Sequence, residues 1–351
     1  MTQFLRNAWY VAAWSGEVER LLLARRLLDT PVVLYRTEDG RPVALHDRCP
    51  HRFAYLSKGK LVGDAVECGY HGLRFDGAGA CVRSPYTDRP PPNARVTSFP
   101  IVERHGAVWI WPGDPQRADE GLIPDHSHLV NPKYGQALGH DMFGGHYLLG
   151  VDNLMELTHL YFLHTSTIGG GREDGTPPDG ETYTVEQIGQ RIRSRTFTPG
   201  HRRTGVISDG VDADAELIDR WNDVWWDAPS GMRFDICSTP AGGPRDVEPY
   251  MVQSHFITPQ TASSSHYFWA ASRTFDLGAE ADARYTQFFG NIFRTEDRPM
   301  IEDIQAQMGG EDLLDLKPVI LPRDKGHLLA RQIVARLVDE ELRQALAPAA
   351  E

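Results

Sequence analysis

Two short segments of the chain each combine one cysteine with one histidine. Cys49 and His51 are separated by one proline, and Cys68 and His71 follow with two residues between them. A two-iron cluster can use this division, with both thiolates on one iron and both imidazoles on the other. Because neutral imidazoles replace anionic thiolates, such a cluster has a higher reduction potential than an all-cysteine cluster. The spacing therefore predicts a [2Fe–2S] site that carries single electrons.

Structural zinc is the alternative occupant for the same four residues, because zinc also accepts two sulfur and two nitrogen ligands. Zinc sites, however, more often place Cys-x-x-Cys in one arm and the histidines in the other. The mixed arms, separated by β-type sequence, favour iron and sulfide over zinc.

A second candidate metal site lies in the segment 152–164 (DNLMELTHLYFLH), where His159 and His164 are five residues apart. We expect this stretch to be helical from Val151 to His164. Five residues of a regular helix turn two side chains about 140° apart. Both rings could then bind one ion only if the helix is distorted or ends near His164. Taken alone, two histidines at this spacing are more often ordinary polar helix residues than metal ligands.

The pattern Cys-x-His followed by Cys-x-x-His resembles the signature of the Rieske proteins. Respiratory-chain members have extra cysteines where this chain has Ala54 and Tyr70, and a serine where it has Leu73. The resemblance is therefore to the oxygenase branch of the family, which Arg52 also matches.

The segment 152–164 resembles the motif Asp-Asn-Leu-x-Asp-x-x-His-x-x-x-x-His of the Rieske oxygenases. This resemblance implies that His159 and His164 bind a catalytic Fe(II), with a third ligand from a helix far downstream. The run 293–298 (FRTEDR) matches that position, and Asp297 is preferred to Glu296 because the family's ligand is aspartate. Two histidines and one carboxylate leave one face of the iron open for oxygen and substrate.

Three acidic or amide residues of the same motif have supporting roles by resemblance. Glu156 stands where the family usually has an aspartate that joins the cluster of one subunit to the iron of its neighbour. Its longer side chain would bridge the two centres only with altered geometry. Asp152 and Asn153 also match the family, and we expect them to support the ligands without touching the metal.

The elements that must position these residues fall into two parts. Short β-type runs broken by turns predict an antiparallel β domain up to Trp111, with strands near 31–35, 43–46, 61–68 and 106–111. Two prolines and a glycine in 112–115 end this part, because proline donates no ladder hydrogen bond. We therefore expect a Rieske [2Fe–2S] domain over 1–115 and a catalytic mononuclear iron domain over 116–351.

The second part mixes strands with helices, so the predicted fold class is α+β. A Gly/Pro-rich loop is expected over 169–180, strands over 190–198, 233–239, 251–258 and 266–272, and helices over 281–308 and 326–346. The family resemblance implies that this part is an antiparallel sheet held by helices, a START-like helix-grip.

Composition limits the partners. The chain has 351 residues, and its 48 acidic and 36 basic residues give a net charge of -12 without a basic run, so nucleic acid is not expected as a partner. No apolar run approaches the roughly 18 residues that a membrane helix needs, and we find no signal-peptide pattern. These features predict a cytoplasmic protein without a membrane partner. Cys81 and Cys237 are expected to be buried thiols.

The resemblance extends over nearly the whole chain, and it is strongest to the branch of vanillate O-demethylases and dicamba monooxygenase. Four blocks carry it: 7–12, 49–52, 108–115 and 152–168. It implies a homotrimeric monooxygenase of aromatic compound catabolism that uses O2 and removes a methyl group from a methoxylated aromatic acid. Hydroxylation of a ring, an aryl-methyl or an N-methyl group is the alternative within the family, and a Rieske electron carrier is the alternative outside it.

A separate NAD(P)H-dependent flavin/iron–sulfur reductase must supply the electrons. The chain has no GxGxxG motif after a strand and no plant-type ferredoxin cysteine set. A small aromatic substrate is expected, and a carboxylate on it would need a basic partner. The substrate-binding residues stay unassigned, with five candidates: His201, Arg202, Arg203, His255 and Arg273.

Overall fold

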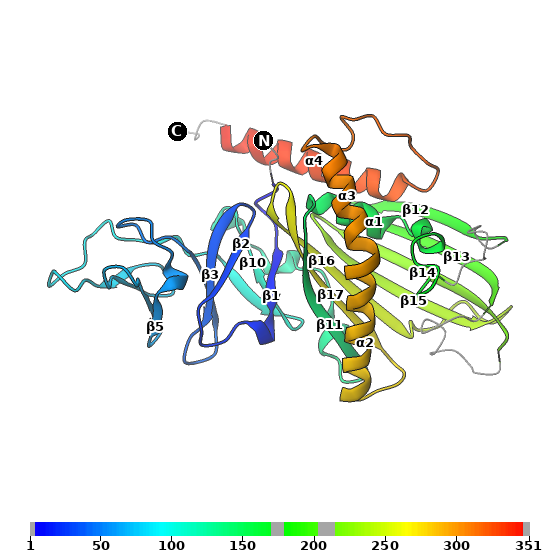
Figure 1. Cartoon of the computed structure of the whole chain (residues 1–351), viewed down its shortest axis with the longest axis horizontal. Coiled ribbons are helices and arrows are strands. Elements are labelled where there is room, and N and C mark those ends of the chain that lie inside the picture. The colour runs from blue at the N-terminus through cyan, green and yellow to red at the C-terminus, as the bar shows by residue number, and fades with distance from the viewer. Residues whose placement is uncertain (1–3, 170–178, 203–214, 347–351) are drawn as a thin grey trace. The chain divides into compact units, whose positions relative to one another are not determined.

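The structure, a computed structural model, describes residues 4–169, 179–202 and 215–346. It divides into two compact units (Figure 1). One unit ends at Ile123 and also includes Thr258–Thr261, and the other begins at Pro124. The sequence placed the domain boundary after Pro115. Among the described residues, no helix combines the length and the apolar character that crossing a membrane requires.

The N-terminal unit consists of three small antiparallel sheets. The three have strand orders β1-β10-β9, β2-β3-β4 and β5-β6-β7-β8. Their bounds are Tyr10–Trp14 (β1), Leu23–Leu27 (β2), Thr30–Arg36 (β3), Pro42–His46 (β4), Lys60–Val62 (β5), Ala65–Glu67 (β6), Arg74–Phe75 (β7), Cys81–Arg83 (β8), Ile101–Arg104 (β9) and Ala107–Ile110 (β10).

The strands predicted near 31–35, 43–46 and 106–111 are confirmed as β3, β4 and β10. The single strand predicted over 61–68 is wrong, because this segment forms the hairpin β5-β6. Its turn contains Gly63 at φ 58°, a left-handed conformation that glycine adopts without a side-chain clash.

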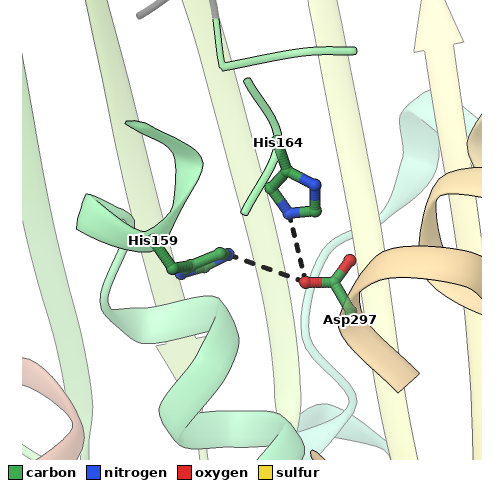
Figure 2. Close-up of side chains that lie close together, drawn as sticks. All are labelled: His159, His164 and Asp297. Carbon is green, nitrogen blue, oxygen red and sulfur yellow. Dashed lines mark hydrogen bonds and ion pairs between the residues drawn. The ribbon is translucent and has the colours of Figure 1, made fainter. Parts of the chain in front are cut away.

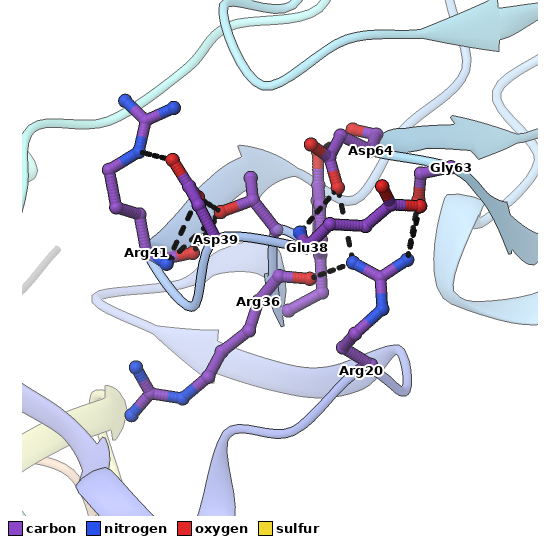
Figure 3. A network of polar contacts seen from close by, with 9 residues as sticks. Arg20, Arg36, Glu38, Asp39, Arg41, Gly63 and Asp64 are labelled. Atoms are coloured by element: carbon purple, nitrogen blue, oxygen red, sulfur yellow. Dashed lines mark hydrogen bonds and ion pairs between the residues drawn. The ribbon is translucent and has the colours of Figure 1, made fainter.

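A polar network fixes this hairpin to the preceding sheet (Figure 3). The Arg20 guanidinium donates to the carbonyl oxygens of Arg36 and Gly63 and to the Asp64 carboxylate, at 3.0–3.1 Å. Asp64 also accepts the backbone N–H of Glu38 at 2.7 Å. The hairpin leads directly into Cys68, so the network holds one arm of the predicted cluster site in place.

The second unit contains a seven-stranded sheet with the order β11-β17-β16-β15-β14-β13-β12. Its strands are Gly135–Phe143 (β11), Thr182–Ile188 (β12), Arg191–Arg202 (β13), Leu217–Asp227 (β14), Gly231–Pro240 (β15), Met251–Thr261 (β16) and Ser264–Arg273 (β17). The four strands predicted from the sequence correspond to β13, β15, β16 and β17. The sequence missed β11, β12 and β14.

Helices pack on this sheet. They are Tyr147–Met155 (α1), Ala279–Ile292 (α2), Arg298–Met308 (α3) and Lys325–Leu346 (α4). Helices α2 and α3 follow one another along the edge that contains β11 (Figure 1). The continuous helix predicted over 281–308 is wrong in detail, because a π-helical turn, Phe293–Asp297, separates α2 from α3. The predicted C-terminal helix is confirmed as α4, and the α+β class is confirmed. Most of the predicted loop 169–180 lies outside the described residues.

Candidate metal centres

Helix α1 ends before the first of the two candidate histidines. It stops at Met155, and Glu156 takes an extended conformation with φ -121° and ψ 106°. His159 lies in a 3-10 turn, Thr158–Tyr161. The helix predicted to reach His164 is therefore too long, but the interruption that the spacing required is present. The break brings both imidazoles to one side of the chain (Figure 2).

The Glu156 side chain and backbone hold this break. The carboxylate accepts the Thr158 backbone N–H at 3.0 Å and the Thr158 hydroxyl at 2.8 Å. The Glu156 carbonyl oxygen lies 2.7 Å from Nδ1 of His159. Because a carbonyl can only accept, Nδ1 carries the proton and Nε2 keeps its lone pair for a metal. Burial lowers the pKa of His159, which also favours the neutral ring.

His164 is fixed through its two ring nitrogens. Nδ1 lies 2.5 Å from the Glu296 carboxylate, and Nε2 lies 3.1 Å from Oδ1 of Asp297. Glu296 also accepts the Thr167 hydroxyl at 2.9 Å. Burial would lower the pKa of His164, but the carboxylates of Asp297 and Glu296 outweigh it and raise the pKa. Glu296 therefore orients the ring, while Nε2 faces Asp297.

Asp297 completes the group. Its Oδ1 lies 3.7 Å from Nε2 of His159 and accepts a hydrogen bond from Asn153 at 3.2 Å. The ligand atoms of His159, His164 and Asp297 lie within 4.8 Å of one another, and within 4–169, 179–202 and 215–346 no other such group of His, Cys, Asp or Glu occurs (Figure 2). Two imidazoles and one carboxylate fit non-haem Fe(II). Asp297, rather than Glu296, is the acid that both Nε2 atoms approach.

The two supporting residues face different ways. Asn153 contacts Asp297, whereas Asp152 faces helix α4. There Asp152 accepts from Arg331 at 2.6 Å and lies 3.2 Å from Nδ1 of His327. Burial would raise the pKa of Asp152, but His327 and Arg331 together lower it. Sequence reasoning missed Arg331 and His327, because no local pattern relates Asp152 to Arg331, 179 positions away, or to His327 one turn earlier on the same helix.

The predicted cluster residues lie in two loops with matching backbone geometry. In the first loop, the N–H of Cys49 donates to Ala54 at 2.8 Å and that of Phe53 donates to Cys49 at 2.9 Å. In the second loop, the N–H of Cys68 donates to Leu73 at 2.8 Å and that of Gly72 donates to Cys68 at 3.0 Å. Phe53 and Gly72 both have positive φ, at 59° and 73°. The two loops therefore share the same backbone turn, in which His51 is the second residue after Cys49 and His71 is the third after Cys68.

The chemistry of these side chains fits a [2Fe–2S] cluster. Cys49 and Cys68 are each 2% exposed in an apolar core, whereas the His51 and His71 rings, with centroids 4.5 Å apart, reach the surface. Burial and the neighbouring Cys68 raise the pKa of Cys49 to about 11. Two adjacent buried thiolates require compensating positive charge, which metal ions supply.

A cavity of about 110 Å³ adjoins His159, His164 and Asp297. Most of its wall is apolar, including Phe234, Ile236 and Trp269. Its polar side chains away from the three candidate ligands include Arg220, Asn222, Gln253 and His255. An apolar pocket with a few polar groups next to a metal is a typical substrate site.

The five candidates for substrate binding lie in different places. His255 lines this cavity, and His201 lines a neighbouring one. Arg273 is fully buried and paired with Asp282 at 2.6 Å, Arg202 is exposed at the end of β13, and Arg203 lies outside the described residues. Sequence reasoning did not consider Arg220, because nothing in its local sequence distinguishes it from a surface arginine.

The class of the protein follows from comparison with known families. A model of the Rieske [2Fe-2S] domain matches residues 8–100, and a model of the vanillate O-demethylase oxygenase C-terminal domain matches residues 143–340. The chain therefore belongs to the Rieske non-haem iron oxygenases. This confirms the family resemblance and the predicted class of enzyme.

Individual relatives match over nearly the full chain. The oxygenase component of dicamba O-demethylase from Stenotrophomonas maltophilia is 36% identical over 95% of this chain and 98% of its own. The iron–sulfur subunit TsaM1 of the toluene-4-sulfonate monooxygenase system from Comamonas testosteroni is 36% identical, covering 96% and 98%. A crystal structure of dicamba monooxygenase bound to 3,6-dichlorosalicylic acid matches with a TM-score of 0.90 and 35% identity, covering 97% and 99%.

The chain is thus the oxygenase component of a multi-component system. It is an oxidoreductase with a [2Fe–2S] cluster and a non-haem iron, it uses O2, and a separate reductase supplies its electrons. The predicted cofactors are confirmed.

Proposed function

We propose that the enzyme removes a methyl group from a methoxylated aromatic acid. The observation that carries this proposal is the convergence of His159 and His164 on Asp297 beside an apolar cavity. Relatives named for dicamba O-demethylation and for an aromatic sulfonate support an aromatic acid as the substrate. The family model named for vanillate O-demethylase supports the same reaction.

The proposed metal ligands follow the two groups of side chains. Cys49, His51, Cys68 and His71 would hold the cluster, and His159, His164 and Asp297 would hold Fe(II). When bound, these groups supply single electrons and the activation of O2 for insertion of oxygen into a C–H bond. The chain itself positions the rings: the Glu156 carbonyl and the Glu296 carboxylate each accept the Nδ1 proton of one histidine, at 2.7 and 2.5 Å.

The reaction would hydroxylate the methoxy carbon of the substrate. One oxygen atom of O2 enters this carbon, and two electrons and two protons convert the other atom to water. The resulting hemiacetal then breaks its bond between the methyl carbon and the phenolic oxygen, which gives a phenol and formaldehyde. The apolar side chains around the cavity exclude bulk water from the reacting carbon.

Glu156 is proposed as the carboxylate that couples the cluster of one subunit to the iron of the next, in a homotrimer. Its place just before His159, with its backbone on the ring nitrogen of that residue, supports this role. Glu156→Gln should keep both metals but lose turnover, and normal turnover in the variant would exclude the coupling role. Sedimentation of the purified wild-type protein tests the oligomeric state separately and should give the mass of a trimer.

A single turnover tests the reaction without the unidentified reductase. The iron-loaded protein is reduced chemically and mixed with methoxybenzoates and ¹⁸O2, and the products are identified by mass spectrometry. Formaldehyde with the matching phenol is expected. A ring- or methyl-hydroxylated product would replace the O-demethylation proposal with the alternative reaction of the family.

A further inference from the structure

Among the described residues of the second unit, several arginines are paired with acids, whereas Arg220 is not. Four of them form ion pairs of 2.6–2.8 Å: Arg273 with Asp282, Arg294 with Asp141, Arg323 with Glu181, and Arg331 with Asp152. Arg220 has no carboxylate partner within the part of the chain that the structure describes. Its Nε is buried and has no hydrogen-bond partner among the same residues. A buried donor without a partner is unfavourable, so this guanidinium is suited to an incoming acceptor.

Arg220 lies where the sheet forms the wall of two cavities. One is the cavity beside His159, His164 and Asp297, and the other contains Glu181. Across the sheet, Arg220 pairs with Thr198 on β13 and with Ser238 on β15, and neither side chain is charged. The Thr198 hydroxyl donates to Glu181 at 2.9 Å.

The nearby acid is already neutralised. Glu181 pairs with Arg323 at 2.8 Å and accepts the Tyr161 hydroxyl. The positive charge of Arg220 is therefore not cancelled by this carboxylate. An anion that entered the catalytic cavity would meet Arg220 as an unpaired cation on an otherwise mostly apolar wall.

We propose that Arg220 determines substrate specificity by pairing with the carboxylate or sulfonate of an aromatic substrate. The planar guanidinium can donate two parallel hydrogen bonds to such a group. Phe234 and Ile236, on the neighbouring strand, line the same cavity and would contact the aromatic ring. Arg220 at one point of the wall and the iron ligands at another would then orient the ring. This inference rests on the proposed function for the identity of the reacting group.

Binding to the iron-loaded holoprotein tests the role of Arg220 without turnover. Benzoate, benzenesulfonate and neutral benzamide are titrated by calorimetry into the wild type and into Arg220→Gln. The wild type should bind the anions at least about tenfold more tightly than benzamide. The substitution removes a charge-assisted hydrogen bond, so it should weaken anion binding by about 10- to 100-fold. It should change benzamide binding by less than about twofold.

A matched control comes from the same sheet. Arg233 on β15 alternates with the cavity residue Phe234 and pairs with Asp235 at 2.8 Å, so it lies on the opposite face. Arg233→Gln should leave all three affinities unchanged. Arg220→Lys, which keeps the charge but loses the fork, should bind benzoate with intermediate affinity, and it carries the test if the glutamine variant does not fold.

Three results would overturn the inference: no preference of the wild type for the anions, a preference that survives in Arg220→Gln, or an equal loss of benzamide binding. The last would indicate a structural role. Failure of the proposed function looks different, because the wild type would then bind the anions through Arg220 yet release no formaldehyde from methoxybenzoates.

Discussion

The Nδ1 atom of His159 donates a hydrogen bond of 2.7 Å to the carbonyl oxygen of Glu156, the extended residue that follows helix α1. The same feature that stops the helix therefore selects the tautomer of a candidate iron ligand. Nε2 is left as the acceptor on the side of Asp297. Groups that fix the orientation of a metal-ligating histidine commonly change metal affinity 10- to 100-fold when removed.

Thr158→Val should weaken iron binding at the mononuclear site about tenfold. The substitution removes the hydroxyl that donates to Glu156 at 2.8 Å and keeps the shape of the side chain. Iron retention is measured by titration with a chelator. Thr87→Val is the control, because the exposed Thr87 hydroxyl also donates to a backbone carbonyl, that of Arg89 at 2.7 Å, and belongs to the N-terminal unit. Equal iron retention in both variants would contradict this role for Thr158.

Asp297→Ala should lose the mononuclear iron and keep the cluster. Iron content would fall from about three to about two atoms per chain, with unchanged visible absorption. Glu296→Ala should keep some of this iron, because Glu296 contacts Nδ1 of His164 and the Thr167 hydroxyl and not the Nε2 atoms that face Asp297. Iron analysis of the two variants side by side checks the order. A larger loss in Glu296→Ala would mean that the two acids have the opposite roles.

Arg331→Met should destabilise the protein by about 3 kcal/mol, because the buried Asp152 carboxylate loses the guanidinium that donates to both of its oxygens, and keeps His327 at 3.2 Å. The double variant Asp152→Asn/Arg331→Met should recover much of this loss. Urea denaturation of the single and double variants measures both effects. If the destabilisation of the double variant equalled the sum of those of the two single variants, loss of the ion pair would not be its cause.

His146 should make the protein less stable in acid. Its Nδ1 accepts the Leu148 N–H at the start of α1, and burial, followed by the charge of Arg331, lowers the pKa of His146 from 6.5 to about 4. The folded state therefore binds fewer protons than the unfolded state between these values. Stability should fall by about 1–2 kcal/mol as the pH drops from 7.5 to 5.

His146→Asn separates this effect from other titrations. Asparagine can also accept the hydrogen bond at the helix start but does not titrate. The variant should lose less stability than the wild type over the same pH range, as measured by thermal unfolding. Identical pH profiles would remove His146 as a source of the acid sensitivity.

Local patterns in the sequence predicted the parts of the site that lie close together along the chain. His159 and His164 are five positions apart, and this spacing requires a broken helix if both rings bind one ion. Asp297 could be identified only through the family resemblance, because a carboxylate on a helix has no local feature that marks it as a ligand. Arg220 and Arg331 could not be predicted, because their roles depend on pairings between distant strands and helices.

Local sequence patterns were also insufficient to predict some elements of the fold. Strand β14 escaped prediction because its residues are buried on both faces yet include charged side chains, such as Asp223, which pairs with Arg193 and Arg195 on β13. Because of such cross-strand ion pairs, a central strand can contain charged residues that are typical of a polar loop. The sequence predicts one strand in place of the hairpin β5-β6, because the turn is short and the residues on both sides of it are similarly apolar.

The π-helical turn that ends at Asp297 changes the rotational phase between helices α2 and α3. The buried residues Ile292 on α2 and Ile301 on α3 are nine positions apart, which on a regular helix would point them about 180° from each other. One additional residue in the turn reduces this angle to about 80°. The extra residue lets both helices keep their apolar faces toward the protein while an acid turns inward between them. If one residue of this turn were deleted, Asp297 could not face inward while both helices keep their apolar faces toward the protein.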